Sequence, residues 1–509
     1  MSWPPITMAT QHPDNAGVPW WRKDPFIPAQ DEIEELLLLF KDLPIDEYMW
    51  DWEGKYVDEA VGEKLFSRAT EFFKEHPLGD DLHLTFRIPA FDVEKMHRMA
   101  RAMMNILSLA DFGDDIGLKR PPVTEMFLPL TTSSDQIFAV RKAFKDIAGY
   151  HRSVFHGAGT SQHDIVRLMR VTPLVEDCAS LFSIRSIVEP FWDALLAEKV
   201  DLSERGVRAF LARSDPAMNA GLIPAVLAVK VALSELAAIG KEKGIAVHPI
   251  IGTGSLPFRG SVNPTYCDTF LEQYAGVRTY SIQSAFRYDY PIDDVRSALE
   301  KIRSEAPRRE AVAISAEEIA RLREFSDDST ALWKETIENL APMINIVAAY
   351  VPPRRERLQH IGLFGYSRGV GKVKLPRAIG FTAALYSIGV PPEFITTGRA
   401  LRLAREQNLL PLLERVYPAL GEDLHHAGKY FNRENLELLA GSDPAFQGIV
   451  EDVAAIEEWR GIPLGPEKPH HVIHRNCTST IVQRLQGSID KEAIQAEIVE
   501  AGKIRRSLG

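Results

Sequence analysis

The chain has 509 residues, of which 45% are hydrophobic and 25% charged, so it has ample material for a buried core. Its formal net charge of -11 argues against general nucleic-acid binding, which needs a basic face, although a local arginine cluster can still bind an anionic substrate. The three cysteines show no CxxC spacing, which argues against a disulfide framework or a cysteine zinc site and fits a cytoplasmic protein.

Membrane association is not expected from the sequence. The N-terminus lacks the basic segment and apolar run of a signal peptide. The most apolar stretch, Leu222 to Ile239, is interrupted by Lys230 and Glu235, and it predicts a buried helix rather than a membrane span.

Short apolar runs alternate with helical stretches along the chain. Seven runs are predicted as strands: 82–88, 125–130, 168–175, 207–212, 246–251, 279–282 and 344–351. An eighth strand is placed at 48–52 or at 361–364. Helices are predicted at 32–41, 315–325, 432–439 and 491–508, the second opening with a capping box from Ser315 to Glu318.

This alternation of strands and helices predicts an α/β fold, a TIM-like (β/α)8 barrel with many additional helices. We expect a single domain over 1–509, with a barrel core at roughly 45–390 and a helical C-terminal part at 391–509. Functional side chains of such barrels lie just past the C-terminal ends of the strands.

A histidine stands near the N-terminus in Thr10-Gln-His-Pro-Asp-Asn15. Because His12 precedes a proline, its backbone is kept out of the α region, and histidine is the natural proton shuttle near neutral pH. The alternative is a capped N-terminal turn with a surface histidine.

Two carboxylates follow predicted strands: Glu176 in Thr172-Pro-Leu-Val-Glu176 and Asp215 in Ser214-Asp-Pro216. Magnesium is commonly held by one or two carboxylates, with substrate oxygens and water completing its shell. The alternative is that either acid caps the helix that follows it.

Two segments have residues suited to binding anions. Gly252-Thr-Gly-Ser-Leu-Pro-Phe-Arg-Gly260 fails the dinucleotide-binding pattern at Pro257, but its Arg259 can bind phosphate or carboxylate in bidentate fashion. The segment 365–377 concentrates Arg368 and Arg377 with two lysines and predicts a phosphate clamp. The alternative for this second segment is a solvated basic loop.

Histidines are crowded near the C-terminus, at His425-His426 and at His470, His471 and His474. No HExxH pattern occurs, and Pro469 favours a turn at that point. We therefore predict surface or interface histidines here.

Taken together, these segments resemble phosphoenolpyruvate carboxylases of the short, archaeal type. The resemblance lies in six segments that follow the family's order from residue 8 to about residue 390. They are Thr10–Asn15, Trp50-Asp-Trp-Glu-Gly54, Thr172–Glu176, Ser214-Asp-Pro-Ala-Met-Asn-Ala-Gly221, Gly252–Gly260 and Ser367-Arg368 with Arg377-Ala-Ile379.

The chain departs from the pattern of the longer bacterial and plant enzymes at three places. Met218 stands where their metal-site motif has lysine, and Thr253 where their glycine loop has its first arginine. Their Asn-Thr-Gly ending is replaced by Arg505-Arg-Ser-Leu-Gly509. Thr253 and the short chain agree with the archaeal branch, whereas Met218 changes one expected substrate contact.

The resemblance implies a carboxy-lyase that converts phosphoenolpyruvate and bicarbonate to oxaloacetate and phosphate, through carboxyphosphate and the enolate of pyruvate, in anaplerotic carbon fixation. It implies Mg²⁺ or Mn²⁺ on Glu176 and Asp215, with His12 and Arg259 as catalytic residues. Its implied substrate-binding residues are Arg87, Gly252, Gly254, Ser255, Arg368 and Arg377. It also implies a cytoplasmic homotetramer.

Two other readings of the sequence stay open at this point. One is another metal-dependent barrel lyase or mutase of the phosphoenolpyruvate/pyruvate type, which would share the metal carboxylates without needing bicarbonate. The other is a helical binding protein without activity, in which Glu176, Asp215 and Arg259 would not converge on one pocket.

Overall fold

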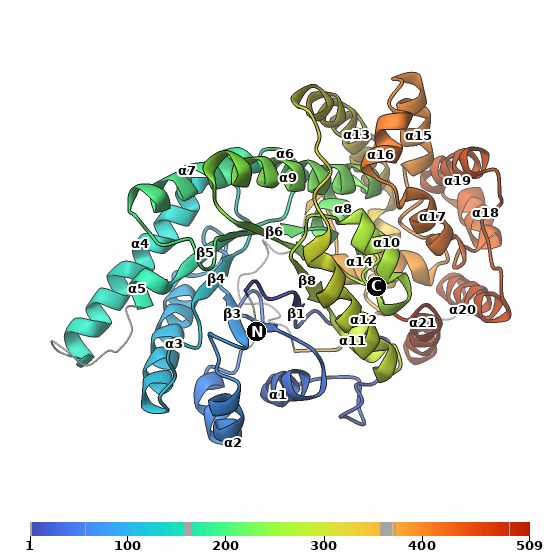
Figure 1. The fold of residues 1–509 in the computed structure, drawn as a ribbon. Helices are drawn as coiled ribbons and strands as arrows, with labels where there is room; N and C mark the ends of the chain where they lie inside the picture. The colour runs from blue at the N-terminus through green and yellow to red at the C-terminus, as the bar shows by residue number, and fades with distance from the viewer. Residues whose placement is uncertain (1–2, 56, 157–164, 357–368, 371–372, 488) are drawn as a thin grey trace.

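The computed structural model describes residues 3–55, 57–156, 165–356, 369–370, 373–487 and 489–509. Eight parallel strands close into a barrel in which each strand pairs with its neighbours in the chain and the last pairs with the first (Figure 1). The strands are β1 (Thr7–Ala9), β2 (Glu47–Asp51), β3 (His83–Arg87), β4 (Glu125–Leu128), β5 (Arg170–Val175), β6 (Val207–Ala212), β7 (Val247–Gly252) and β8 (Thr279–Ile282). The predicted TIM-like barrel is therefore confirmed.

Helices up to α12 lie between the strands or directly after the last one. They are α1 (Glu32–Asp42), α2 (Val61–Glu75), α3 (Met96–Asp115), α4 (Ser134–His151), α5 (Ile165–Leu168), α6 (Cys178–Phe182), α7 (Ile184–Ala197), α8 (Ser214–Ala220), α9 (Leu222–Lys243), α10 (Cys267–Gln273), α11 (Ser284–Tyr288) and α12 (Ile292–Glu305). The α9 helix packs against α8 and α13 and is mostly buried, as its apolar sequence predicts.

The described residues of the rest of the chain form helices and their connections, together with a short antiparallel pair of strands, β9 (Gly369–Val370) and β10 (Val373–Lys374). Its helices are α13 (Ala316–Ala348), α14 (Ala378–Ser387), α15 (Thr397–Glu406), α16 (Leu410–Val416), α17 (Leu420–Gly428), α18 (Arg433–Ser442), α19 (Gln447–Arg460), α20 (Pro469–Gln486) and α21 (Lys491–Arg505). Figure 1 shows α15 to α21, in orange to red, gathered at one side of the barrel, and α14 packs on α8, α13, α20 and α21.

The barrel interior is filled in layers by alternate strands, as is usual for this fold. Met49, Phe127 and Phe210, from β2, β4 and β6, belong to one apolar cluster. Nearer the strand starts, the guanidinium of Arg208 is paired with Glu47 and Glu125, each at 2.7 Å. This end is therefore plugged by an ion cluster, and the open end lies at the carboxyl ends of the strands.

Six of the seven predicted strands form within two residues of their expected bounds. The seventh, at 344–351, is wrong: these residues end α13 and continue into a turn. Leu340, Ile344 and Val347 are buried at helical spacing, whereas Ile346 is 51% exposed, so the apolar run is one face of a helix.

The remaining two strands of the barrel are β2 and β1. The first fits one of the two placements proposed for an eighth strand, and the other placement, 361–364, lies outside the described residues. The three-residue β1 was not predicted, because Thr7–Ala9 is too short to give an alternating pattern. The four predicted helices form, and Ser315 caps α13 by accepting the Glu318 amide at 3.3 Å.

The prediction of surface or interface histidines is wrong for three of the five, because these three are buried within the chain itself. His426, His471 and His474 are 6%, 3% and 0% exposed, and Pro469 begins α20 instead of a turn. Stacking explains the burial: the His426 ring lies 4.3 Å from that of Tyr266. Burial lowers the pKa of His426 to about 3, so this ring is neutral in the core.

One helix in the described part of the chain, α9, is long and apolar enough to cross a membrane. Within the protein, 83% of its most apolar window is buried. This agrees with the buried helix expected from the sequence.

Candidate active site

A cavity opens at the carboxyl ends of the barrel strands. It brings together seven of the residues singled out in the sequence: His12, Arg87, Glu176, Asp215, Gly252, Arg259 and Arg377. The other polar residues that line it are Glu53, Ser214, Ser281 and Gln283. Apolar side chains complete the wall: Leu174, Phe210, Ala212, Ala378 and Ile379. A mixed wall of this kind suits a small anionic molecule with an apolar end.

His12 follows β1 and is partly buried at the cavity wall. Its Nδ1 lies 2.9 Å from the Thr10 hydroxyl oxygen, two residues earlier. Arg287 holds this segment from behind by donating to the Thr10 carbonyl at 3.0 Å. The motif thus fixes the ring of His12 through both the side chain and the backbone of Thr10.

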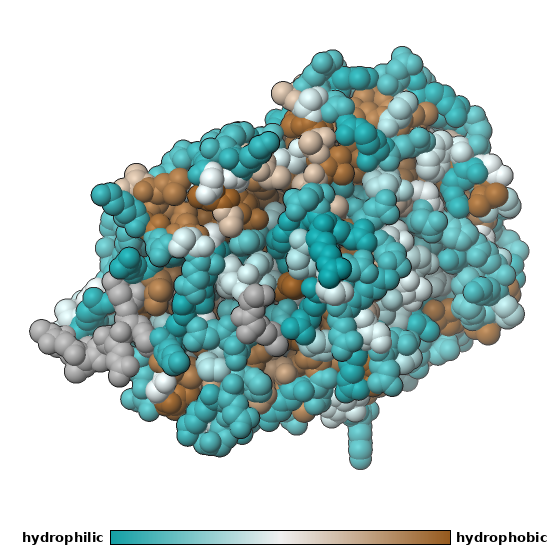
Figure 2. Space-filling view, in the orientation of Figure 1, coloured by the Kyte–Doolittle hydropathy of each residue, from teal (hydrophilic) through white to brown (hydrophobic). Residues whose placement is uncertain are grey.

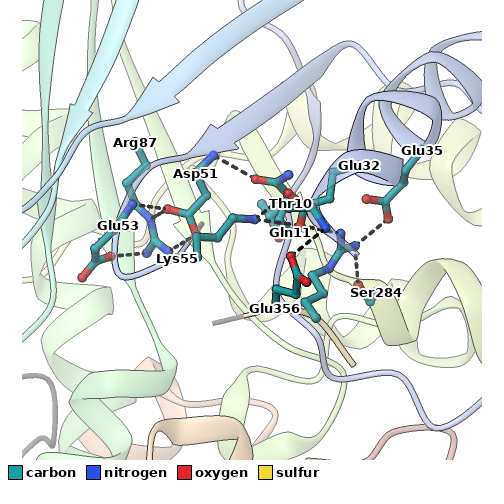
Figure 3. A network of polar contacts seen from close by, with 12 residues as sticks. Thr10, Gln11, Glu32, Glu35, Asp51, Glu53, Lys55, Arg87, Ser284 and Glu356 are labelled. Carbon is teal, nitrogen blue, oxygen red and sulfur yellow. Dashed lines mark hydrogen bonds and ion pairs between the residues drawn. The ribbon is translucent and has the colours of Figure 1, made fainter. Parts of the chain in front are cut away.

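Arg87, the last residue of β3, is held between two carboxylates (Figure 3). Its guanidinium donates to both oxygens of Asp51, at 2.8 and 2.6 Å, and is paired with Glu53 at 2.8 Å. Burial alone would lower the pKa of Arg87, but Asp51 and Glu53 outweigh it and raise that pKa well above its usual range. Arg87 is therefore a permanent cation held in one orientation.

The polar network in Figure 3 continues from Asp51 and Lys55 to Glu32 and Glu35. Glu35 is fully buried and is paired with Arg355 at 2.6 Å and with Arg287 at 3.1 Å. Burial opposes its ionisation, but the two arginines lower the pKa of Glu35 to about 2. Lys55 and Glu32 pair beside it at 2.8 Å, so the segments after β1, β2 and β8 are cross-linked by charge.

Glu176 and Asp215 come from neighbouring strand ends and line the same cavity. Glu176 is 4% exposed and accepts the Leu130 amide at 2.9 Å. The capping role falls instead to Asp177, which accepts the Ser180 amide at 2.8 Å at the start of α6. Asp215 lies inside the first turn of α8, whose N-cap residue is Arg213.

The donor set fits a hard divalent cation. Both side chains are carboxylates, the ligands that Mg²⁺ and Mn²⁺ favour, and Mg²⁺ commonly takes only one or two of them from a protein. Among the described residues, no group of three His, Cys, Asp or Glu side chains is placed to hold a metal ion by itself. A cation here would therefore need oxygens from substrate or water.

Arg259 is 1% exposed and lies on a one-turn 3-10 helix, Pro257–Arg259, in the glycine-rich loop. Its guanidinium donates to Asp14 at 3.0 Å, to Gln283 at 2.5 Å and to the Gly509 backbone oxygen at 2.5 Å. The loop needs glycine at 254, because a Cβ there would lie 2.6 Å from the Arg259 guanidinium carbon.

Other predicted substrate-binding residues fall in different places. Gly252 is on the cavity wall, whereas Gly254 and the 2% exposed Ser255 are in the loop behind it and do not line the cavity. Arg377 lies over Gly54, and a Cβ at position 54 would come within 2.6 Å of the Arg377 guanidinium. The φ of Gly54 is +61°, which also favours glycine at this position. Arg368 lies outside the described residues.

Met218, which replaces the lysine of the longer enzymes, is fully buried in the main hydrophobic core. Its backbone oxygen accepts the Trp333 indole N–H at 2.8 Å. Met218 is not among the residues that line the cavity.

No role was assigned from the sequence to several residues that line the cavity or that hydrogen-bond to its lining residues. Glu53 lies in the quoted Trp50–Gly54 motif, so its pattern was visible, but its pairing with Arg87 was not. Asp14 lies in the His12 motif and binds Arg259 across 245 residues of sequence. Gln283 and Ser281 flank the end of β8, where the barrel rule alone marks them as candidates.

Comparison with known proteins shows the family of this chain. The family model described as phosphoenolpyruvate carboxylase matches residues 5–509. Proteins named phosphoenolpyruvate carboxylase are similar over 99% of both chains: 36% identical in Leuconostoc mesenteroides, 37% in Caldivirga maquilingensis and 36% in Methanothermobacter thermautotrophicus. With a closed parallel barrel and the motifs gathered at its open end, the chain belongs to the phosphoenolpyruvate carboxylase family and is a carboxy-lyase.

Proposed function

We propose that this enzyme carboxylates phosphoenolpyruvate with bicarbonate, giving oxaloacetate and phosphate as an anaplerotic supply of four-carbon acid. The observation that carries the proposal is the convergence of His12, Arg87, Arg259 and the two carboxylates on one cavity. Family membership supports the same substrates. A helical binding protein without activity does not account for this gathering of charged groups.

The first step is transfer of the phosphoryl group. A bicarbonate oxygen attacks phosphorus, and the bond from phosphorus to the enol oxygen breaks, which leaves carboxyphosphate and the enolate of pyruvate. Arg87, Arg377 and, by resemblance alone, Arg368 neutralise the phosphoryl oxygens as charge is redistributed over them. Arg87 is prepared for this role because Asp51 and Glu53 fix its guanidinium before substrate arrives.

The second step joins the carbon atoms. His12 accepts the proton of carboxyphosphate, which then separates into phosphate and carbon dioxide. Carbon dioxide is attacked by the methylene carbon of the enolate, and oxaloacetate is formed. Arg259, held by Asp14 and Gln283, stabilises the anions while the apolar wall excludes water, which would otherwise protonate the enolate to pyruvate.

Glu176 and Asp215 are the residues that would hold Mg²⁺ or Mn²⁺. When bound, such an ion supplies a positive charge that orients the substrate and offsets its negative charge. The Leu130 amide holds Glu176 in position, and Ser214 adjoins Asp215 on the cavity wall.

The assay of this function uses purified enzyme, phosphoenolpyruvate, bicarbonate and Mg²⁺, with oxaloacetate and phosphate measured together. We expect the two products in equal amounts, no turnover without bicarbonate, and oxygen-18 from labelled bicarbonate in the phosphate. Turnover that is independent of bicarbonate would instead assign the chain to a lyase or mutase of the phosphoenolpyruvate type.

We also propose a cytoplasmic homotetramer in which residues 1–509 act as one domain. The three cysteines are unpaired, which suits a reducing compartment. Figure 2 shows apolar patches on a mostly hydrophilic face, and Leu438 and Ile473 on the C-terminal helices are 40% and 51% exposed. Light scattering at micromolar concentration should give four times the mass of one chain, and a monomer would contradict the assembly.

A further inference from the structure

The outer side of the glycine-rich loop is held by the C-terminal helical part, through a buried carboxylate. Glu393 lies in the turn between α14 and α15 and is 0% exposed. Its Oε1 accepts the backbone N–H of Phe258 at 2.7 Å and the hydroxyl of Tyr386 at 2.7 Å. Phe258 directly precedes Arg259, and its N–H belongs to the peptide group between Pro257 and Phe258, so this bond anchors the one-turn 3-10 helix that carries the arginine.

The position is an unusual one for a carboxylate. Among the described residues, none bonds to its second oxygen and no arginine or lysine is paired with it. Burial raises the pKa of Glu393 to about 7, while the bonds from Tyr386 and the backbone oppose that rise. A side chain placed only for packing would carry no such cost, because an apolar residue of similar size fills the same space.

Three other contacts hold the same loop, and each acts at a different point. The Phe258 ring stacks on both Trp333 and Phe381, at 5.7 and 5.6 Å between ring centres, and these two rings also contact each other. Arg213 donates to the Phe258 carbonyl at 3.1 Å. Asp423 accepts the Ser261 hydroxyl at 2.5 Å. Glu393 binds the backbone N–H of the residue before Arg259, whereas Asp423 binds a side-chain hydroxyl two residues after it.

We propose that Glu393 is a positioning residue: its carboxylate holds the Phe258 amide so that Arg259 meets the reaction intermediate in one orientation. The inference rests on the proposed function, in which Arg259 retains carboxyphosphate and the enolate. At a pH above its raised pKa of about 7, the Glu393 carboxylate is ionised, and hydrogen bonds to an ionised acceptor are roughly twice as strong as those to a neutral one. Loss of the negative charge on Glu393 therefore weakens the bond that orients Arg259, while the Arg259 side chain itself is kept.

The test compares Glu393→Gln with the unaltered enzyme for the amounts of oxaloacetate and pyruvate formed per phosphate released. Glutamine keeps the shape and one acceptor but not the charge. We expect kcat for oxaloacetate to fall about tenfold and the pyruvate share to rise about threefold, because small misplacements of a catalytic group are costly. KM for phosphoenolpyruvate should change by less than about twofold, since ground-state binding is kept.

Glu47→Gln is the matched control. Glu47 is also 0% exposed, but it pairs with Arg208 at the opposite end of the barrel. This control is expected to lower the melting temperature and to leave the product ratio unchanged. If Glu393→Gln fails to fold, Tyr386→Phe, which removes the second donor to the same oxygen, should give a smaller shift of the product ratio in the same direction.

The outcomes distinguish failure of the positioning role of Glu393 from failure of the proposed carboxylase function. A folded Glu393→Gln enzyme whose kcat and product ratio equal those of the unaltered protein overturns the positioning role. A fall in kcat with an unchanged ratio and a lowered melting temperature also overturns it, because that result indicates a structural role alone. If the unaltered enzyme and the Glu47→Gln control form no oxaloacetate, the proposed function fails instead.

Discussion

Replacing His12 with asparagine is expected to separate cleavage of phosphoenolpyruvate from carboxylation. If His12 removes the proton of carboxyphosphate, the first step, which needs bicarbonate and the cationic side chains, continues without it. The variant should therefore release phosphate and pyruvate slowly while oxaloacetate formation falls by about two to four orders of magnitude, the range for general acid–base catalysis. Phosphate, pyruvate and oxaloacetate are measured in the same samples.

A binding role for His12 predicts a different pattern. KM for phosphoenolpyruvate would rise and both activities would fall together, with the product ratio unchanged. His248→Asn is the matched control, because His248 lies near the start of β7, at the end of the barrel away from the cavity. Its product ratio and kcat should equal those of the unaltered enzyme.

Removing one of the two cavity carboxylates is expected to abolish tight metal binding. Glu176→Gln and Asp215→Asn each remove one proposed ligand, and the loss of affinity for Mn²⁺ should exceed the roughly 10- to 100-fold typical of outer-shell changes. Free Mn²⁺ is measured by electron paramagnetic resonance in the absence of substrate, so the readout is independent of turnover. Oxaloacetate formation should fall in parallel.

Asp177→Asn provides the control at the neighbouring position. Asp177 carries the same charge, but it caps α6 through the Ser180 amide instead of lining the cavity. Asparagine is also a good cap, so stability and Mn²⁺ affinity should both be kept. Unchanged affinity in both Glu176→Gln and Asp215→Asn would show that the metal lies elsewhere.

Much of the barrel could be predicted because its strands are short apolar runs with clear boundaries. The strands at 207–212 and 279–282 form with the predicted bounds. At 344–351 the same reasoning fails, because a run of apolar residues looks alike in a buried strand and on one face of a helix. Here α13 continues through most of the run, as the spacing of Leu340, Ile344 and Val347 shows.

The cavity wall was largely visible in the sequence, because motif residues that end parallel strands must meet at one end of the barrel. The residues that hold these cavity residues in position through hydrogen bonds could not be identified from the sequence. Glu393 reaches Phe258 across 135 residues, and no local pattern marks a lone glutamate between two helices as a partner of that amide. Likewise, the burial of His474 depends on helices that pack only in the folded protein.

The closure of the barrel by β1 has a consequence for synthesis of the chain. Thr279 bonds to the backbone of Pro5 across 274 residues, and β1 pairs with β8 on one side. At about 5 to 20 residues per second, the ribosome takes tens of seconds to supply the partner strand. Until then β1 has an unpaired edge, and the segment that carries His12 has no fixed place. The N-terminal part of the site is made first but needs β8 before its strand is paired on both sides.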